Sequence, residues 1–170
     1  MNRKIRIVIA CIALVGAVIC GILIFRMVRD GRKEMFRETI EEAWNRSDAG
    51  DLPEYLRYIE TVTEFEVEKV ENGDPMIITV TVRGIDLGGE LKKTGPADYF
   101  GAVDEVSMNS YLIDLAKIAG PTEVTAIVYA WTEGEDYRIE FSDTFVDAMS
   151  GMVWSYVMDL VDELTGGGAA

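Results

Sequence analysis

The chain has 170 residues, with 30 aspartates and glutamates, 16 lysines and arginines, and no histidine. The missing histidine excludes Ser-His-Asp and Cys-His catalysis and every zinc site that uses histidine. The net charge of -14 argues against a nucleic-acid partner, because phosphate binding requires a basic surface. The length and an apolar fraction of 49% predict one folded domain with an appendage.

An apolar segment of 19 residues, 7–25, contains no charged side chain. At a rise of about 1.5 Å per residue, it is about as long as the hydrocarbon core of a bilayer is thick. Basic residues flank it on both sides. The predicted organisation is a basic flank at 1–6, a transmembrane helix at 7–25, a basic juxtamembrane segment at 26–31, a soluble α+β domain at 32–164 and a flexible tail at 165–170.

A cleaved signal peptide or lipoprotein signal is the alternative interpretation of this segment. A signal peptide has a shorter apolar region that ends in small residues at the cleavage site, and no such pattern ends this one. Too few apolar residues precede Cys11 for a lipoprotein signal, and Cys20 follows Ile19, where a small residue is required. We therefore favour an uncleaved membrane helix.

The predicted localisation is the cell membrane, with a single span and the domain outside the cytoplasm. Positive charge on both flanks leaves the orientation open, but a short basic N-terminus tends to stay inside while long C-terminal domains are translocated. Both cysteines lie within the span, so the domain has no disulfide. Small residues recur every four positions in the span and predict a packing face for a second span, unless they reflect only the usual composition of membrane helices: Ala13, Ala17 and Gly21.

Charge is divided unevenly along the chain. Residues 47–170 contain 25 acidic and 7 basic residues, a net charge of -18. The basic juxtamembrane residues are suited to anionic lipid headgroups, which would repel the acidic domain. The simpler interpretation is that the acidic surface keeps a small domain soluble.

The first half of the domain predicts two helices and a hairpin. Apolar spacing favours a helix over 32–45, and Asp51 is the expected N-cap of a second helix whose first turn contains Pro53. Strands are expected at 62–70 and 76–85, joined by a tight turn at Asn72-Gly73. In the second strand Ile78, Val80 and Val82 alternate with polar residues, which predicts one buried face.

The second half predicts a helix, a second hairpin and a final helix. Residues 84–96 are expected to form a connection, and 97–118 a helix that ends before Gly120-Pro121. Two strands follow, and then a long helix capped by Ser142 or Asp143; the expected bounds are 123–131, 137–141 and a helix end at Leu164. Two hairpins predict a four-stranded antiparallel sheet with helices on one face, an α+β fold.

Several of these segments resemble uncharacterised membrane-tethered proteins and lipoproteins of Gram-positive bacteria that have a cystatin-like or NTF2-like domain. The resemblance covers about residues 31–160, and the segments that carry it are 51–56, 65–67, 72–74, 78–82, 122–125, 137–140 and 145–151. The chain departs from these proteins in lacking a lipobox and in having Tyr137-Arg138 where they often have Trp-Lys. The resemblance implies an extracytoplasmic domain and carries over no catalytic residue.

The acidic residues are the remaining candidates for chemistry. Glu64, Glu66 and Glu68 alternate along one strand face, which is typical of a solvated edge strand and lacks the cleft that a glycosidase needs. The acidic turn of Glu133, Glu135 and Asp136 could bind calcium weakly, but its spacing matches no EF-hand loop. We therefore predict no catalytic residue, no metal site and no cofactor.

Two groups of apolar residues are candidates for binding. Trp154 and Met158 fall opposite the predicted core stripe of the last helix, which suggests a surface for a protein partner or a second copy, unless another element covers them. An NTF2-like cone often encloses a pocket, and its lining would be Tyr99, Phe100, Tyr129 and Trp131.

The predicted function is that of a membrane-anchored, extracytoplasmic binding or assembly module without catalytic activity. A small-ligand sensor or carrier that uses the NTF2-like pocket is the first alternative. A hydrolase that depends on carboxylates is the second.

Overall fold

The computed structural model has an α+β architecture and describes the backbone of residues 3–47, 52–94 and 105–164; side chains are described for 20–46, 52–94 and 106–163. The described elements are α1 (Arg3–Ser47), α2 (Glu54–Val62), β1 (Glu64–Glu71), β2 (Met76–Ile85), α3 (Leu87–Thr94), α4 (Glu105–Ile118), β3 (Pro121–Glu133), β4 (Asp136–Phe141), α5 (Asp143–Met149) and α6 (Val153–Leu164). The described strands form one antiparallel sheet in the order β1-β2-β3-β4. The predicted α+β class and the sheet with its two hairpins are confirmed.

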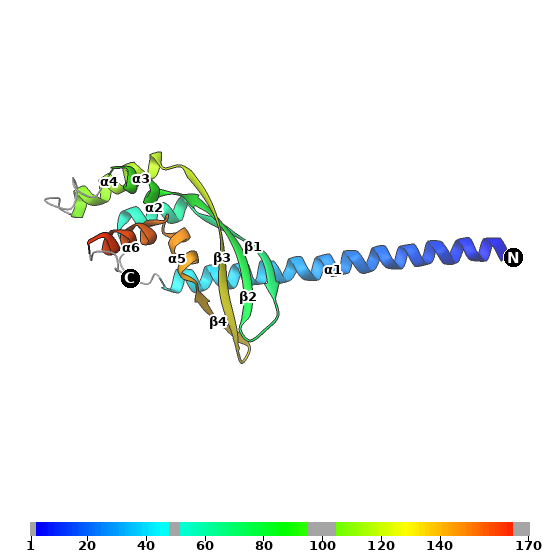
Figure 1. Ribbon diagram of the computed structural model, residues 1–170. Coiled ribbons are helices and arrows are strands. Elements are labelled where there is room, and N and C mark those ends of the chain that lie inside the picture. The colour runs from blue at the N-terminus through cyan, green and yellow to red at the C-terminus, as the bar shows by residue number, and fades with distance from the viewer. Residues whose placement is uncertain (1–2, 48–51, 95–104, 165–170) are drawn as a thin grey trace, which may run out of the picture.

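Helix α1 joins the predicted span and the first helix of the domain into one continuous element. Figure 1 shows its N-terminal part extending far beyond the sheet, while its C-terminal part lies against the sheet. Among the described residues, no helix contains a segment both long and apolar enough to cross a membrane. Side chains 7–19 of the predicted span lie outside the described residues, so the transmembrane helix stays a prediction.

The first hydrophobic core lies between one face of the sheet and the helices α1 and α5. The three alternating residues of β2, Ile78, Val80 and Val82, are fully buried there, as predicted. They pack with Phe36 and Ile40 of α1, which lie four residues apart on one side of that helix. Burial of this stripe fixes the C-terminal part of α1 across the sheet.

The two hairpins differ in how their strands are joined. The predicted tight turn at Asn72-Gly73 is a longer connection, because β1 ends at Glu71 and β2 begins at Met76 after a cis Asp74-Pro75 peptide bond. The β3–β4 hairpin has a two-residue turn, in which Gly134 adopts a positive φ of 68°. A tight turn therefore occurs in the second hairpin and not at the Asn-Gly pair.

A second hydrophobic core joins the remaining helices at one end of the sheet (Figure 1). Its buried residues are Ile59, Leu87, Leu91, Leu115, Ala116 and Tyr156. The expected connection at 84–96 is wrong for 87–94, which form α3. Leu87 and Leu91 are buried four residues apart, and the Asp86 carboxylate accepts a hydrogen bond from the backbone N–H of Gly89 at 2.7 Å. Helix α2 begins at Glu54 and has Pro53 in its N-cap position, so the prediction that Asp51 caps this helix and that Pro53 lies in its first turn is wrong. Residues 97–104 of the expected third helix lie outside the described residues.

The predicted single helix from Ser142 to Leu164 is broken into α5 and α6. Ser142 caps α5, since its hydroxyl accepts the backbone N–H of Phe145 at 3.2 Å. Gly151 then adopts a positive φ of 71°, which ends the helix. The Asp147 carboxylate accepts the backbone N–H of Ser155 at 2.9 Å and caps α6.

This break also corrects the expected core stripe of the last helix. Phe145 and Met149 belong to the core beneath the sheet, whereas Tyr156 belongs to the core between the helices. A continuous helical periodicity cannot describe a chain that changes direction at Gly151, so one apparent stripe serves two cores.

Candidate functional site

Trp154 and Met158 are exposed on α6, as predicted. The exposed fractions are 52% for Trp154 and 44% for Met158. Large apolar side chains on a surface are suited to a partner, but their exposure does not identify one. Their role in a partner surface stays a prediction.

The predicted internal pocket is not supported by its two described residues. Tyr129 and Trp131 alternate with Val128 and Ala130, which are buried toward the helices, so both aromatic side chains lie on the outer face of the sheet. The guanidinium of Arg138 covers the Trp131 ring, 4.7 Å from its centroid. The two expected partners in the pocket, Tyr99 and Phe100, lie outside the described residues.

The predicted packing face in the span can be placed only in part. Ala13 and Ala17 lie outside the described side chains. At Gly21, an added Cβ would have no described atom within 4 Å. The surface around Gly21 is therefore open, and span packing stays a prediction.

The row of glutamates on β1 is interrupted. A β-bulge between Val67 and Lys69 shifts the register, so Glu68 does not continue the alternation of Glu64 and Glu66. Glu66 accepts a hydrogen bond from Arg83 at 3.2 Å, and Arg83 also donates to Glu123 at 2.8 Å. Glu66 is thus part of a cross-strand ion-pair network with Arg83 and Glu123.

The acidic turn belongs to a wide groove beside the last strand. Glu133 pairs with Arg138 at 3.3 Å, and the described residues contain no cluster of three or more potential ligands that could hold a metal ion. The groove has a volume of about 1070 Å³. We call it the β4 groove; its lining residues are Met35, Thr39, Glu42, Ala43 and Arg46 of α1 and Glu133, Glu135, Asp136, Tyr137, Arg138 and Ile139 of the hairpin.

Strand β4 presents a free backbone edge to this groove. It is the last strand of the sheet in the described part of the chain. The N–H of Ser142 donates to the Ile127 carbonyl at 3.3 Å. In an antiparallel pair every second residue bonds to the neighbouring strand, so the even-numbered residues of β4 form the hydrogen bonds with β3. The N–H and C=O groups of Tyr137 and Ile139 therefore point away from β3, toward the groove. Unpaired groups of this kind can bind a further strand.

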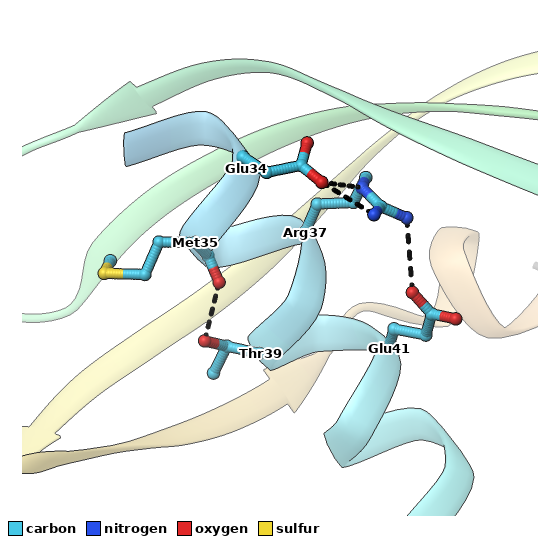
Figure 2. A network of polar contacts seen from close by, with 5 residues as sticks. All are labelled: Glu34, Met35, Arg37, Thr39 and Glu41. Atoms are coloured by element: carbon cyan, nitrogen blue, oxygen red, sulfur yellow. Dashed lines mark hydrogen bonds and ion pairs between the residues drawn. The ribbon is translucent and has the colours of Figure 1, made fainter. Parts of the chain in front are cut away.

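Helix α1 forms the opposite wall of the groove. Figure 2 shows Met35 and Thr39 on one side of the helix and Arg37 on another, where its guanidinium binds the carboxylates of Glu34 and Glu41. The Thr39 hydroxyl donates to the Met35 carbonyl at 2.8 Å. Met35, Thr39 and Ala43 present small and apolar side chains to the groove, and the exposed ion pair of Glu42 with Arg46 lines it as well.

The charges around α1 and the groove differ in how far they are neutralised. The Arg37 hydrogen bond lowers the pKa of the Glu34 carboxyl, and Glu34 in turn raises the pKa of Arg37. Both arginines that line the groove are paired, Arg46 with Glu42 at 3.1 Å and Arg138 with Glu133 at 3.3 Å. Within the described residues, Glu135 and Asp136 have no such ion pair, and both are exposed, so the groove has an excess of negative charge at its hairpin end.

The sequence pattern predicts β4 and its acidic turn but does not predict the groove. The alternation of Tyr137, Ile139 and Phe141 with charged residues predicts an inward face. It does not indicate which strand lies at the edge of the sheet, or that α1 passes beside that edge.

A scan against protein-family models found no matching family, and searches of curated proteins and of solved structures found no significant match.

Proposed function

We propose that this protein is a membrane-anchored binding module that acts without catalysis and holds an extended segment of a partner protein along the edge of β4. The domain would lie outside the cytoplasm, on the span predicted at 7–25. The free backbone edge of Tyr137 and Ile139, which faces a groove of about 1070 Å³, carries this proposal. Addition of a strand to an exposed sheet edge is a common way to recognise peptides.

The chemistry of the groove defines the expected segment. Its backbone would pair with β4, and alternate side chains would enter the space between Ile139 and the wall formed by Met35, Thr39 and Ala43. Small or apolar side chains suit that wall. Basic side chains suit the hairpin end, where Glu135 and Asp136 are exposed without an ion pair among the described residues. The segment we propose is therefore extended, with alternating apolar residues and a basic end.

The arrangement of α1 supports a cystatin-like rather than an NTF2-like domain within this proposal. The observation behind this choice is that α1 packs against one face of the four-stranded antiparallel sheet. Tyr129 and Trp131 lie on the outer face of the sheet, away from the predicted pocket, which counts against a ligand-binding cone.

The proposal is tested by selecting displayed random peptides on the full chain in lipid nanodiscs. We expect the selected peptides to alternate apolar and other residues and to be enriched in lysine and arginine at one end. Binding should protect the amide hydrogens of Tyr137 and Ile139 from exchange, because those amides would be hydrogen-bonded to the peptide.

Two charge variants make this test specific. The double variant Glu135→Lys with Asp136→Lys should weaken the binding of the selected peptides by about tenfold, because two exposed charges that attract their basic end become repulsive. The matched control, Glu38→Lys with Glu163→Lys, makes the same charge change at exposed positions that do not line the groove. Equal weakening in both variants, or protection of amides outside β4, would contradict the proposal.

A further inference from the structure

A second cleft lies where α1 leaves the domain. It has a volume of about 530 Å³ and is formed between α1 and the hairpin of β1 and β2. Phe25, Val28 and Val70 supply apolar surface, and Arg29, Arg32, Lys33 and Lys69 supply positive charge. We call it the juxtamembrane cleft. Its lining includes one acidic residue, Glu68, so the cleft is both amphipathic and basic.

The position of the cleft along α1 places it beside the predicted membrane span. Phe25 is the last residue of the apolar segment 7–25, and Lys33 lies eight residues further along the helix. Eight residues of α-helix rise about 12 Å, and the polar headgroup layer of a leaflet is about 5 to 8 Å thick. With the span in a bilayer, Phe25 and Val28 lie at the boundary of the hydrocarbon, and the basic residues lie at and just above the headgroups.

The basic side chains of the cleft differ in how they are held. Arg32 is half-buried; its guanidinium lies 5.8 Å from the Phe36 ring centroid and donates to the Met76 sulfur at 3.4 Å. Lys69 contacts Glu71 at 2.6 Å, in an exposed pair. Within the described residues, Lys33 has no ion pair. Arg32 is therefore positioned by apolar neighbours, and Lys33 is open to an anion.

We propose that the juxtamembrane cleft binds the phosphate group of an anionic phospholipid of the membrane that holds the span. Lys33, Lys69 and Arg32 would contact the phosphate, while Phe25 and Val28 would contact the upper part of the acyl chains. This inference rests on the proposed membrane anchoring. It deepens that proposal by orienting the domain: a net charge of -18 over 47–170 is repelled by anionic headgroups, so the basic cleft would be the surface turned toward them.

The test measures lipid binding to the full chain in detergent micelles by native mass spectrometry. Phosphatidylglycerol and phosphatidylcholine are added separately, and phosphatidylglycerol is also added together with inorganic phosphate as a competitor. We expect phosphatidylglycerol to bind more tightly than phosphatidylcholine. The double variant Lys33→Gln with Lys69→Gln should weaken the binding of phosphatidylglycerol by about 25-fold, because each basic residue near the headgroups contributes about fivefold to the affinity.

A matched control distinguishes the loss of lysines in the cleft from a general loss of positive charge. Lys93→Gln with Lys117→Gln removes two exposed lysines that lie outside the cleft and should leave lipid binding unchanged. Unchanged phosphatidylglycerol binding in the cleft variant would overturn the inference, and so would inorganic phosphate that competes fully with the lipid. Failure of the chain to remain in vesicles after carbonate extraction would instead refute the membrane anchoring itself.

Discussion

At the scale of single residues, Asp147 is a buried carboxylate that connects two helices. Asp147 is 5% exposed. Its carboxylate accepts hydrogen bonds from the backbone N–H of Ser155 at 2.9 Å and from the Ser155 hydroxyl. Its own carbonyl accepts the N–H of Met152 at 2.8 Å. Asp147 therefore joins the end of α5 to the start of α6. A buried carboxylate of this kind is often assigned to catalysis, but here its hydrogen bonds account for it.

We predict that Asp147→Ala lowers the free energy of unfolding by about 2 kcal/mol, since a helix cap is lost and a half-buried N–H is left without its acceptor. The control is Asp143→Ala, which removes an exposed carboxylate from the first turn of α5 and should cost about 0.5 kcal/mol. Chemical unfolding of the full chain in micelles, followed by circular dichroism, measures both. Similar losses in the two variants would contradict the capping role.

At the scale of elements, the packing of α3 against the junction of α5 and α6 holds the second core together. The N–H of Gly88 donates to the Gly151 carbonyl at 3.0 Å. A Cβ added at Gly88 would lie 2.0 Å from the Met152 carbonyl oxygen, which is backbone and cannot rotate away. Glycine at 88 is thus required because α3 approaches the backbone of the α5–α6 junction closely.

Gly88→Ala should therefore lower the free energy of unfolding by about 3 kcal/mol, because the two backbones must separate to admit a methyl group. Gly120→Ala is the matched control, since an added Cβ there meets no described atom within 4 Å, and we expect a change within about 0.5 kcal/mol. Thermal unfolding of both variants tests this. A Gly88→Ala protein as stable as the control would show that α3 does not pack as described.

At the scale of the whole molecule, one continuous helix connects the predicted span to the sheet. The end of α1 that lies on the sheet buries Phe36 and Ile40, so the domain cannot rotate freely about the helix without losing that burial. The two proposed binding surfaces lie at different heights along α1, the juxtamembrane cleft at 25–33 and the β4 groove at 35–46. This spacing would hold a bound segment above the membrane while the cleft contacts lipid.

The orientation of the molecule is tested by cysteine labelling in cells. In a background of Cys11→Ser and Cys20→Ser, Thr132→Cys places a thiol at an exposed position of the β3–β4 hairpin. We expect an impermeant maleimide to label it in intact cells, because the domain is predicted to be translocated. Asn2→Cys is the control and should be labelled only after lysis. The opposite pattern would place the domain in the cytoplasm.

The sequence alone determined the elements whose signals are local. Alternation predicted the buried face of β2, a serine predicted the start of α5, and the chain order of two hairpins predicted the antiparallel sheet. Each of these depends on neighbours within a few residues.

The contacts between elements that are distant in the sequence became clear only from the tertiary structure. The periodicity of 142–164 predicted one helix. The hydrogen bond that the Ser155 N–H donates to the Asp147 carboxylate and the positive φ of Gly151 divide this segment between two cores. The helix at 87–94 is stabilised by burial against elements distant in the sequence. The glycines at 88 and 89 weaken its local helix signal, so the sequence pattern does not predict it. The β4 groove exists because β4 is an edge strand and α1 passes beside it. Strand order is a property of the whole sheet that no local pattern encodes.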